Sequence, residues 1–151
     1  MSAARILTWE ELRETFFKML LEKVEKPEIM AYFHNLFNIV LFKTQLWSVD
    51  FRVTTNENFL GCFRYDEPDG DAIILDVEAF EGWEPFSGTM LHEMCHQMQR
   101  LVEGARDEPM HGPVFMKWAE ICGLEPEPDD ESEEPALATP LNEAQPDPEP
   151  S

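Results

Sequence analysis

The helical segment at residues 86–103 constrains the fold more than any other part of the sequence. Apolar side chains recur there at the spacing of a buried helix, and no proline interrupts residues 87–105. The pattern H-E-x-x-H stands within it, at residues 92–96. Residues four apart lie on one face of a helix, so His92 and His96 would lie side by side. The segment therefore predicts one core helix that presents two imidazoles together.

Two imidazoles on one helix face, with an acidic residue between them, are typical of a catalytic zinc site. Such a site uses three protein ligands and leaves the fourth position to water, whose pKa falls to about 7 on the metal. Glu93 leaves the helix in another direction and would accept the proton as this water attacks a peptide carbonyl. His111 is the candidate third ligand, because the Gly112 that follows lets the backbone turn at the site. The alternative third ligands are Glu103, Glu108 and Glu120.

The charge of the chain is strongly acidic and unevenly distributed. Asp and Glu number 31 against 11 Lys and Arg, which gives a formal net charge of −20. Ten of these acids lie in residues 124–151, which are rich in proline, contain no base and show no apolar period. We therefore expect a folded domain at residues 1–123 and a disordered acidic tail at 124–151. The tail would be a solvated segment; a sharper alternative is that it docks a basic partner or shields the cleft.

The composition also limits partners and compartment. An acidic body shows no basic footprint for nucleic acid and would repel a phosphate backbone, although Arg100, Arg106 and Lys117 surround the motif. The three cysteines form no C-x-x-C pair, and we expect reduced thiols. No signal peptide stands at the start, and no apolar run reaches the roughly 18 residues that span a membrane. We expect a nuclear or cytoplasmic monomer that is neither secreted nor membrane-bound.

Three further helices are predicted around the motif helix. A capping box at Thr8 and Glu11 opens the first, which ends before Pro27. The second starts at Pro27, runs to about residue 41 and has a wide apolar surface, so His34 on it is a packed or surface histidine. Ser87 or Thr89 would cap the motif helix. The last helix spans residues 113–122 and is closed by a glycine, Gly123.

Three short strands are predicted between the second helix and the motif, at residues 49–53, 59–65 and 72–77. Gly61 in the middle of the second indicates a bulge or the close approach of a neighbour. Turn-forming residues 66–70 would join the second and third strands into a hairpin. The expected architecture is a single α+β domain with a small antiparallel or mixed sheet packed by helices.

With these elements in order, the chain resembles the SprT-like (Spartan-type) zinc metalloprotease family over roughly residues 33–122. The segments that carry the resemblance are Leu36-Phe37-Asn38 with Leu41-Phe42, Leu60-Gly61-Cys62-Phe63, Ile73-Ile74-Leu75, and residues 89–96 with His111-Gly112-Pro113-Val114-Phe115. The resemblance implies a zincin-like fold with Zn²⁺ on His92, His96 and His111, and Glu93 as general base. It also implies a protease that digests proteins near DNA, including DNA–protein crosslinks.

Two departures from the family pattern leave the peptidase chemistry intact but argue against dependence on DNA. Gln97 follows the second histidine, where the family usually has a small residue, and the acidic tail stands where many members carry a zinc ribbon. We therefore expect a zinc-dependent endopeptidase acting on protein substrates, with two alternatives. One is a zinc-stabilised binding module without catalysis, and the other is a zinc peptidase unrelated to DNA. Tyr65 and Arg100 are the candidate donors to the oxyanion, and Trp83 is a candidate lining residue of the cleft.

Overall fold

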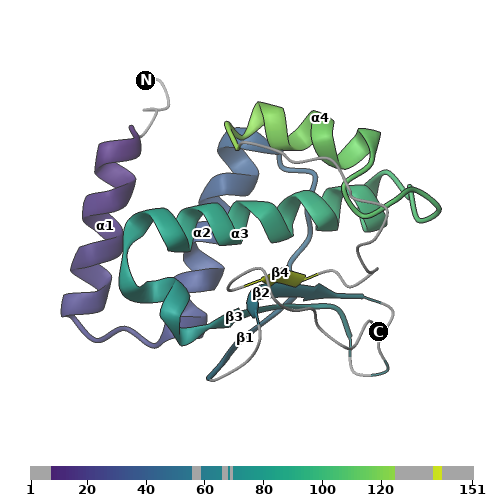
Figure 1. The fold of residues 1–151 in the computed structure, drawn as a ribbon. Coiled ribbons are helices and arrows are strands. Elements are labelled where there is room, and N and C mark those ends of the chain that lie inside the picture. The colour runs from purple at the N-terminus through teal and green to yellow at the C-terminus, as the bar shows by residue number, and fades with distance from the viewer. Residues whose placement is uncertain (1–7, 56–58, 66–67, 69, 125–137, 141–151) are drawn as a thin grey trace.

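The computed structural model describes residues 8–55, 59–65, 68, 70–124 and 138–140. It confirms the α+β class (Figure 1). In chain order the elements are α1 (Trp9–Leu21), α2 (Lys26–Leu41), β1 (Asp50–Thr54), β2 (Phe59–Arg64), β3 (Ala72–Asp76), a 3₁₀ turn η1 (Val77–Glu81), α3 (Trp83–Gln97), a π-helical turn η2 (Met98–Val102), α4 (Pro113–Ile121) and β4 (Ala138–Pro140). In the described part of the chain, no helix is long and apolar enough to cross a membrane.

The sheet is mixed and has the strand order β1-β3-β2-β4. β3 pairs parallel with β1 and antiparallel with β2, and the β2–β3 pair is the expected hairpin. The three predicted strands are joined by a short fourth one, β4, in which Thr139 lies opposite Gly61. The three residues of β4 belong to the segment predicted to be a disordered tail. The rest of that tail, and most of the predicted turn at 66–70, lie outside the described residues.

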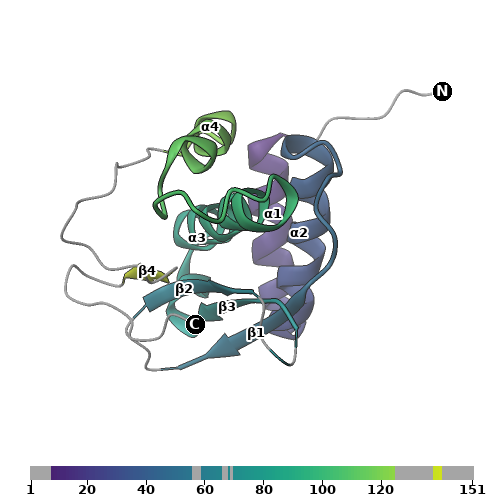
Figure 2. The same ribbon diagram turned by 90° about the vertical axis from the view of Figure 1, so that its right-hand side faces the viewer.

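α3 lies between the sheet and α4, and α1 and α2 cross its direction (Figures 1 and 2). An aromatic cluster joins the three helices α1, α2 and α3. Phe86 of α3 stacks on Phe16 of α1, with ring centroids 4.6 Å apart, and meets Phe33 of α2 edge-on at 5.5 Å. All three side chains are fully buried. Each contributes on the order of 2–3 kcal/mol by leaving water, so this cluster holds the motif helix in place.

The outer helix ends follow the sequence signals. Thr8 and Glu11 form the predicted capping box: the Oγ1 of Thr8 accepts from the Glu11 amide at 3.1 Å, and the Thr8 amide donates to Glu11 Oε1 at 2.9 Å. At the end of α4, Gly123 adopts a φ of 77°, a left-handed conformation that suits glycine. The Leu124 amide then donates to the carbonyl oxygen of Ala119 at 2.9 Å. This is a Schellman closure, which satisfies the last carbonyl groups of the helix.

The predicted start of the motif helix is wrong. α3 begins at Trp83 with Gly82 as its N-cap, so Ser87 and Thr89 are buried inside the helix and do not cap it. The reason is that Pro85 falls within the first turn, where a helix needs no backbone N–H and tolerates proline. The predicted end at residue 103 corresponds to the π turn η2, which continues α3 from Met98 to Val102.

At Gly61, the backbone of β2 comes close to the side chains of α3. A Cβ built there would touch the Cγ2 of Thr89, and would lie 3.0 Å from Leu75 Cδ2 and 3.2 Å from Glu93 Oε2. The predicted close approach of a neighbour is therefore confirmed. The absence of a side chain at this residue lets the motif helix rest directly on the strand.

Candidate metal centre

Three histidines gather at the end of α3. His92 and His96 lie on α3, and His111 comes from the loop before α4. One ring nitrogen of each lies within 4.8 Å of the others. The ring centroids are 5.0 Å apart for His92 and His96, and 5.2 and 5.3 Å from each of these to His111. Among the described residues, this is the group of His, Cys, Asp and Glu side chains that is close enough to hold a metal ion.

The hydrogen-bonding state of the rings fits a metal. The Nε2 atoms of His92 and His96 are buried and have no hydrogen-bond partner among the described residues. An unsatisfied buried polar atom costs about 1–3 kcal/mol. Three imidazoles are a ligand set that zinc accepts, with the fourth position left to water. A metal ion at this point would satisfy both orphaned nitrogens at once.

Burial keeps the rings of His92 and His96 neutral. Burial first, and then the nearby His111, lower the pKa of His92 to about 3. The pKa of His96 lies well below its usual value, again mainly through burial and then through the two neighbouring histidines. Neutral imidazole is the form that binds a metal. His92 and His96 therefore need not lose a proton at neutral pH in order to bind a metal.

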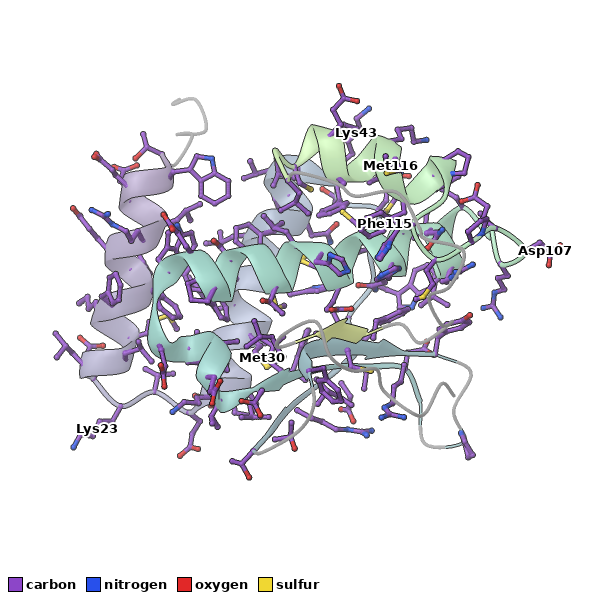
Figure 3. The ribbon with its side chains drawn as sticks, in the orientation of Figure 1. Lys23, Met30, Lys43, Asp107, Phe115 and Met116 are labelled. Atoms are coloured by element: carbon purple, nitrogen blue, oxygen red, sulfur yellow. The ribbon has the colours of Figure 1, made fainter. Side chains whose placement is uncertain are left out.

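Phe115 of α4 closes the cluster on one side. Its ring lies 5.0 Å from His92, 4.6 Å from His96 and 4.7 Å from His111, measured between centroids. It lies between α4 and α3 in Figure 3. A fully buried ring in contact with all three imidazoles restricts their rotation and keeps water from that side of the site.

Glu93 follows His92 on α3 and is fully buried. It faces β2, since its Oε2 would lie 3.2 Å from a Cβ at Gly61. A carboxylate removed from water is costly unless positive or hydrogen-donating groups surround it. A cation held by the adjacent histidines would supply positive charge beside this carboxyl group.

The carboxylates considered as third ligands point elsewhere. Glu103 Oε2 accepts from Lys117 Nζ at 2.8 Å and from the Trp118 indole at 2.6 Å. Lys117 and then Trp118 hold the pKa of Glu103 below its usual value. Glu108 Oε1 accepts from the side-chain amide of Gln99 at 3.1 Å. Glu120 is exposed on α4. The carboxylates of Glu103 and Glu108 are thus engaged in structural hydrogen bonds.

The predicted reason for a glycine at residue 112, freedom of the backbone to turn, is wrong. Its φ is −81°, a value that any residue adopts, so backbone freedom is not required. Instead, a Cβ at this residue would lie 2.9 Å from Glu108 Oε1 and 3.1 Å from the carbonyl oxygen of Pro109. Gly112 is needed because the loop that carries His111 folds tightly against Glu108.

Two glutamines next to the motif have roles that the sequence analysis missed. Gln99 Oε1 lies 3.3 Å from Nδ1 of His96. Gln97, the residue that departs from the family pattern, lies 2.9 Å from Nε2 of His34 through its Oε1 and donates to the carbonyl oxygen of Trp47 at 2.9 Å. His34 is therefore a buried histidine whose pKa is lowered by burial and partly restored by this bond. Helical spacing, which places residue i+3 over residue i, was the available signal for Gln99.

The remaining candidates make structural contacts with nearby residues. Nη1 of Arg100 donates to the carbonyl oxygens of Ala105 and Glu108, at 2.9 and 3.2 Å, and so holds the loop before His111. Tyr65 stacks on Phe63, at 5.6 Å between centroids. Trp83 is a buried member of the aromatic core at the far end of α3 and not a lining residue of the metal centre. The three cysteines are buried, and Sγ of Cys95 lies 4.0 Å from Sγ of Cys122.

Comparison with known proteins gives one match. A family model described as the SprT-like family matches residues 27–133, which is more than half of the chain. The matched range begins with α2 and contains all three histidines and Glu93. The curated proteins and the solved structures contain no match to this chain.

Proposed function

This chain belongs to the SprT-like family, and we propose that it is a zinc-dependent endopeptidase. The observation that carries the proposal is the convergence of three histidine nitrogens within 4.8 Å, next to the buried carboxyl group of Glu93. Neutral imidazoles suit zinc, and a three-ligand set leaves a coordination position for water. A purely structural zinc site is usually closed by four protein ligands and has no use for a buried base.

His92, His96 and His111 would hold the zinc. When bound, zinc supplies an acidified water and a Lewis acid for the carbonyl group of the scissile peptide. The carboxylate of Glu93 would accept a proton from the water that attacks the carbonyl carbon. The same carboxyl group then gives a proton to the amide nitrogen as the C–N bond breaks. The packing of α3 on Gly61 fixes Glu93 for both transfers.

We propose protein substrates, and DNA-associated or crosslinked proteins among them, with a nuclear or cytoplasmic location. The link with DNA rests on the sequence resemblance to Spartan-type proteases. The net charge of −20 favours a second candidate, a zinc peptidase without any link to DNA, because an acidic surface repels phosphate. A third candidate, a zinc-stabilised binding module, leaves the buried base of Glu93 without a task.

Metal analysis and a cleavage assay test the proposal together. The purified protein should contain one zinc per chain and cleave casein or histone, assayed with and without DNA. Glu93→Gln should keep zinc and lose about 100-fold or more in turnover, because it keeps the size of the side chain and removes the base. His111→Ala should lose zinc. The exposed Glu120 on α4 offers a matched control, since Glu120→Gln should change neither property.

Each outcome either refutes one part of the proposal or favours one of the other candidate functions. Full zinc content in His111→Ala would remove that residue from the ligand set. Unchanged turnover in Glu93→Gln would refute the mechanism. A parent protein that binds zinc and cleaves nothing would be the binding module, and cleavage that is indifferent to DNA would favour the second candidate.

A further inference from the structure

A chain of hydrogen bonds runs from His96 away from the metal centre to the start of α4. It begins at Nδ1 of His96, which lies 3.3 Å from Gln99 Oε1. The side-chain nitrogen of Gln99 donates to Glu108 Oε1 at 3.1 Å and to the carbonyl oxygen of Pro109 at 3.0 Å. Glu108 Oε1 also accepts from the backbone amide of Val114 at 3.2 Å. This series of hydrogen bonds therefore connects the end of α3, which carries His92 and His96, with the loop that carries His111.

The partners of Gln99 fix which way its amide group points. The carboxylate of Glu108 and the carbonyl group of Pro109 only accept hydrogen bonds, so the amide nitrogen must face them. The amide oxygen must then face His96, and it also only accepts. Nδ1 of His96 therefore carries the ring proton. In a neutral imidazole this leaves Nε2 with a free lone pair, and Nε2 is the buried atom of His96 that lacks a hydrogen-bond partner in the described part of the chain.

Glu108 fixes the other end. Its carboxylate sits at the first turn of α4, where a negative charge is favoured by the helix dipole. Gly112 packs so tightly on it that a Cβ would lie 2.9 Å from its Oε1. The backbone carbonyl oxygen of Glu108 accepts a hydrogen bond from Arg100 at 3.2 Å. The loop on both sides of His111 is thus attached to this one residue.

The π turn after α3 places Gln99 for this task. The Glu103 amide donates to the carbonyl oxygen of Met98 at 2.8 Å, a spacing of five residues, and the Ala105 amide donates to that of Gln99 at 2.8 Å. Such wide turns occur often at functional sites. Gln99 is fully buried, so its polar atoms need partners inside the protein.

We propose that Gln99 and Glu108 are positioning residues of the metal centre. Gln99 holds His96 in the tautomer that offers Nε2 to the metal. Glu108 fixes the position of Gln99 and of the loop that carries His111. The inference rests on the proposed function only in taking these histidines as metal ligands. It does not require that the protein cleaves peptides.

Four variants test the individual hydrogen bonds of Gln99 and Glu108. Gln99→Met keeps the length of the side chain and removes every bond. Gln99→Glu keeps an acceptor for His96 and removes the two donors. Glu108→Gln keeps an acceptor for Gln99, whereas Glu108→Ala removes it. The matched control is Gln97→Met, because Gln97 is an equally buried glutamine on the same helix that bonds His34 and no proposed ligand.

Zinc affinity, measured by competition with a chromophoric chelator, is the first readout. Loss of a ligand's supporting hydrogen bond costs about 10–100-fold in metal affinity. We expect such a loss in Gln99→Met and Glu108→Ala, a smaller one in Gln99→Glu, and little change in Glu108→Gln. Gln97→Met should melt at a lower temperature with unchanged zinc affinity. Equal affinity in Gln99→Met and the parent would overturn the proposal, even if both glutamine variants melt lower.

The tautomer of His96 is the second readout, and it needs neither metal nor activity. Long-range ¹H–¹⁵N NMR spectra of the metal-free protein distinguish a proton on Nδ1 from one on Nε2. The parent should carry it on Nδ1, and Gln99→Met should show a mixture. A proton on Nε2 in the parent would overturn the proposal. A parent with the expected tautomer and zinc affinity but no peptidase activity would refute the proposed function and leave this inference standing.

Discussion

Gly61→Ala should damage both the stability and the chemistry of the protein, because one methyl group would enter the contact between β2 and α3. The new Cβ would collide with the Cγ2 of Thr89 and lie 3.0 Å from Leu75 Cδ2 and 3.2 Å from Glu93 Oε2. The first contact is with a β-branched side chain on a helix, whose rotation about χ1 is restricted. The strand and the helix must therefore separate.

The size of the effect can be bounded from these contacts. Overpacking of a tight core costs about 1–3 kcal/mol, while replacing glycine by alanine returns about 0.4–1 kcal/mol through the unfolded chain. We expect a net loss of about 1–2 kcal/mol in the free energy of unfolding. Turnover should fall more than stability suggests, since a displacement of about 1 Å near the chemistry can cost about 100-fold.

A second substitution tests whether the collision is the cause. Thr89→Ser removes the Cγ2 and alone should cost about 1 kcal/mol, as deletion of one buried methyl does. In the double variant the alanine methyl takes the space of the lost one. We therefore expect urea denaturation and histone cleavage of the double variant to lie nearer the parent than those of Gly61→Ala. Additive losses, or a Gly61→Ala protein with parental stability and turnover, would refute the argument.

Two further predictions concern groups outside the metal cluster. Burial lowers the pKa of His34 from its usual 6.5, so the folded protein binds a proton there less readily than the unfolded chain, and stability is lost as the pH falls below 6.5. His34→Gln keeps a partner for Gln97 and should flatten this fall by up to about 1.4 kcal/mol per pH unit in urea titrations between pH 6.5 and 5; parallel curves would contradict it. Glu103→Ala should leave zinc affinity unchanged and cost about 1 kcal/mol of stability, because the Trp118 indole loses its acceptor; loss of zinc would instead make Glu103 a ligand.

The parts of the fold that the sequence predicted are those set by local chemistry. The capping box at Thr8 and the glycine after α4 act over a few residues, and both form as expected. His92 and His96 come together because they lie one turn apart on a single helix. The closeness of Gly61 to a neighbour was readable from a glycine inside an aromatic strand, although the neighbour itself was not.

The parts that escaped prediction depend on contacts between distant segments. Ser87 and Thr89 are good caps in isolation, but the aromatic core extends α3 back to Trp83 and buries them. Gln99 and Glu108 are nine residues apart, and only the path of the loop brings their side chains together. The same path decides that Gly112 is required by packing against Glu108. Sequence spacing carries no information about either contact.

The acidic tail offers the last prediction, which concerns the domain boundary and the link with DNA. The Schellman closure of α4 is complete at Leu124, and this side chain packs against the core. Residues beyond it include β4, whose three residues pair with β2. Ending the chain after Leu124 keeps the helix closure and the packing of Leu124 and, of the described strands, loses only the three-residue β4 with its pairing to β2, so the melting temperature should change little. A large fall would show that β4 contributes substantially to the stability of the sheet and would refute a boundary at this residue.

The same truncation removes ten acids, so the net charge falls in magnitude from −20 to −10. Repulsion of phosphate weakens with it, and affinity for duplex DNA or for basic proteins should rise. Ending the chain after Leu141 is the matched control: it keeps β4, removes Glu143, Asp147 and Glu149, and should have a smaller effect. Fluorescence anisotropy at two salt concentrations measures this, and the gain should shrink with salt, because exposed charges are screened over about 8 Å at physiological ionic strength. An equal gain from both truncations would exclude charge as the cause. Weaker binding of basic proteins after truncation would instead identify the tail as their docking segment.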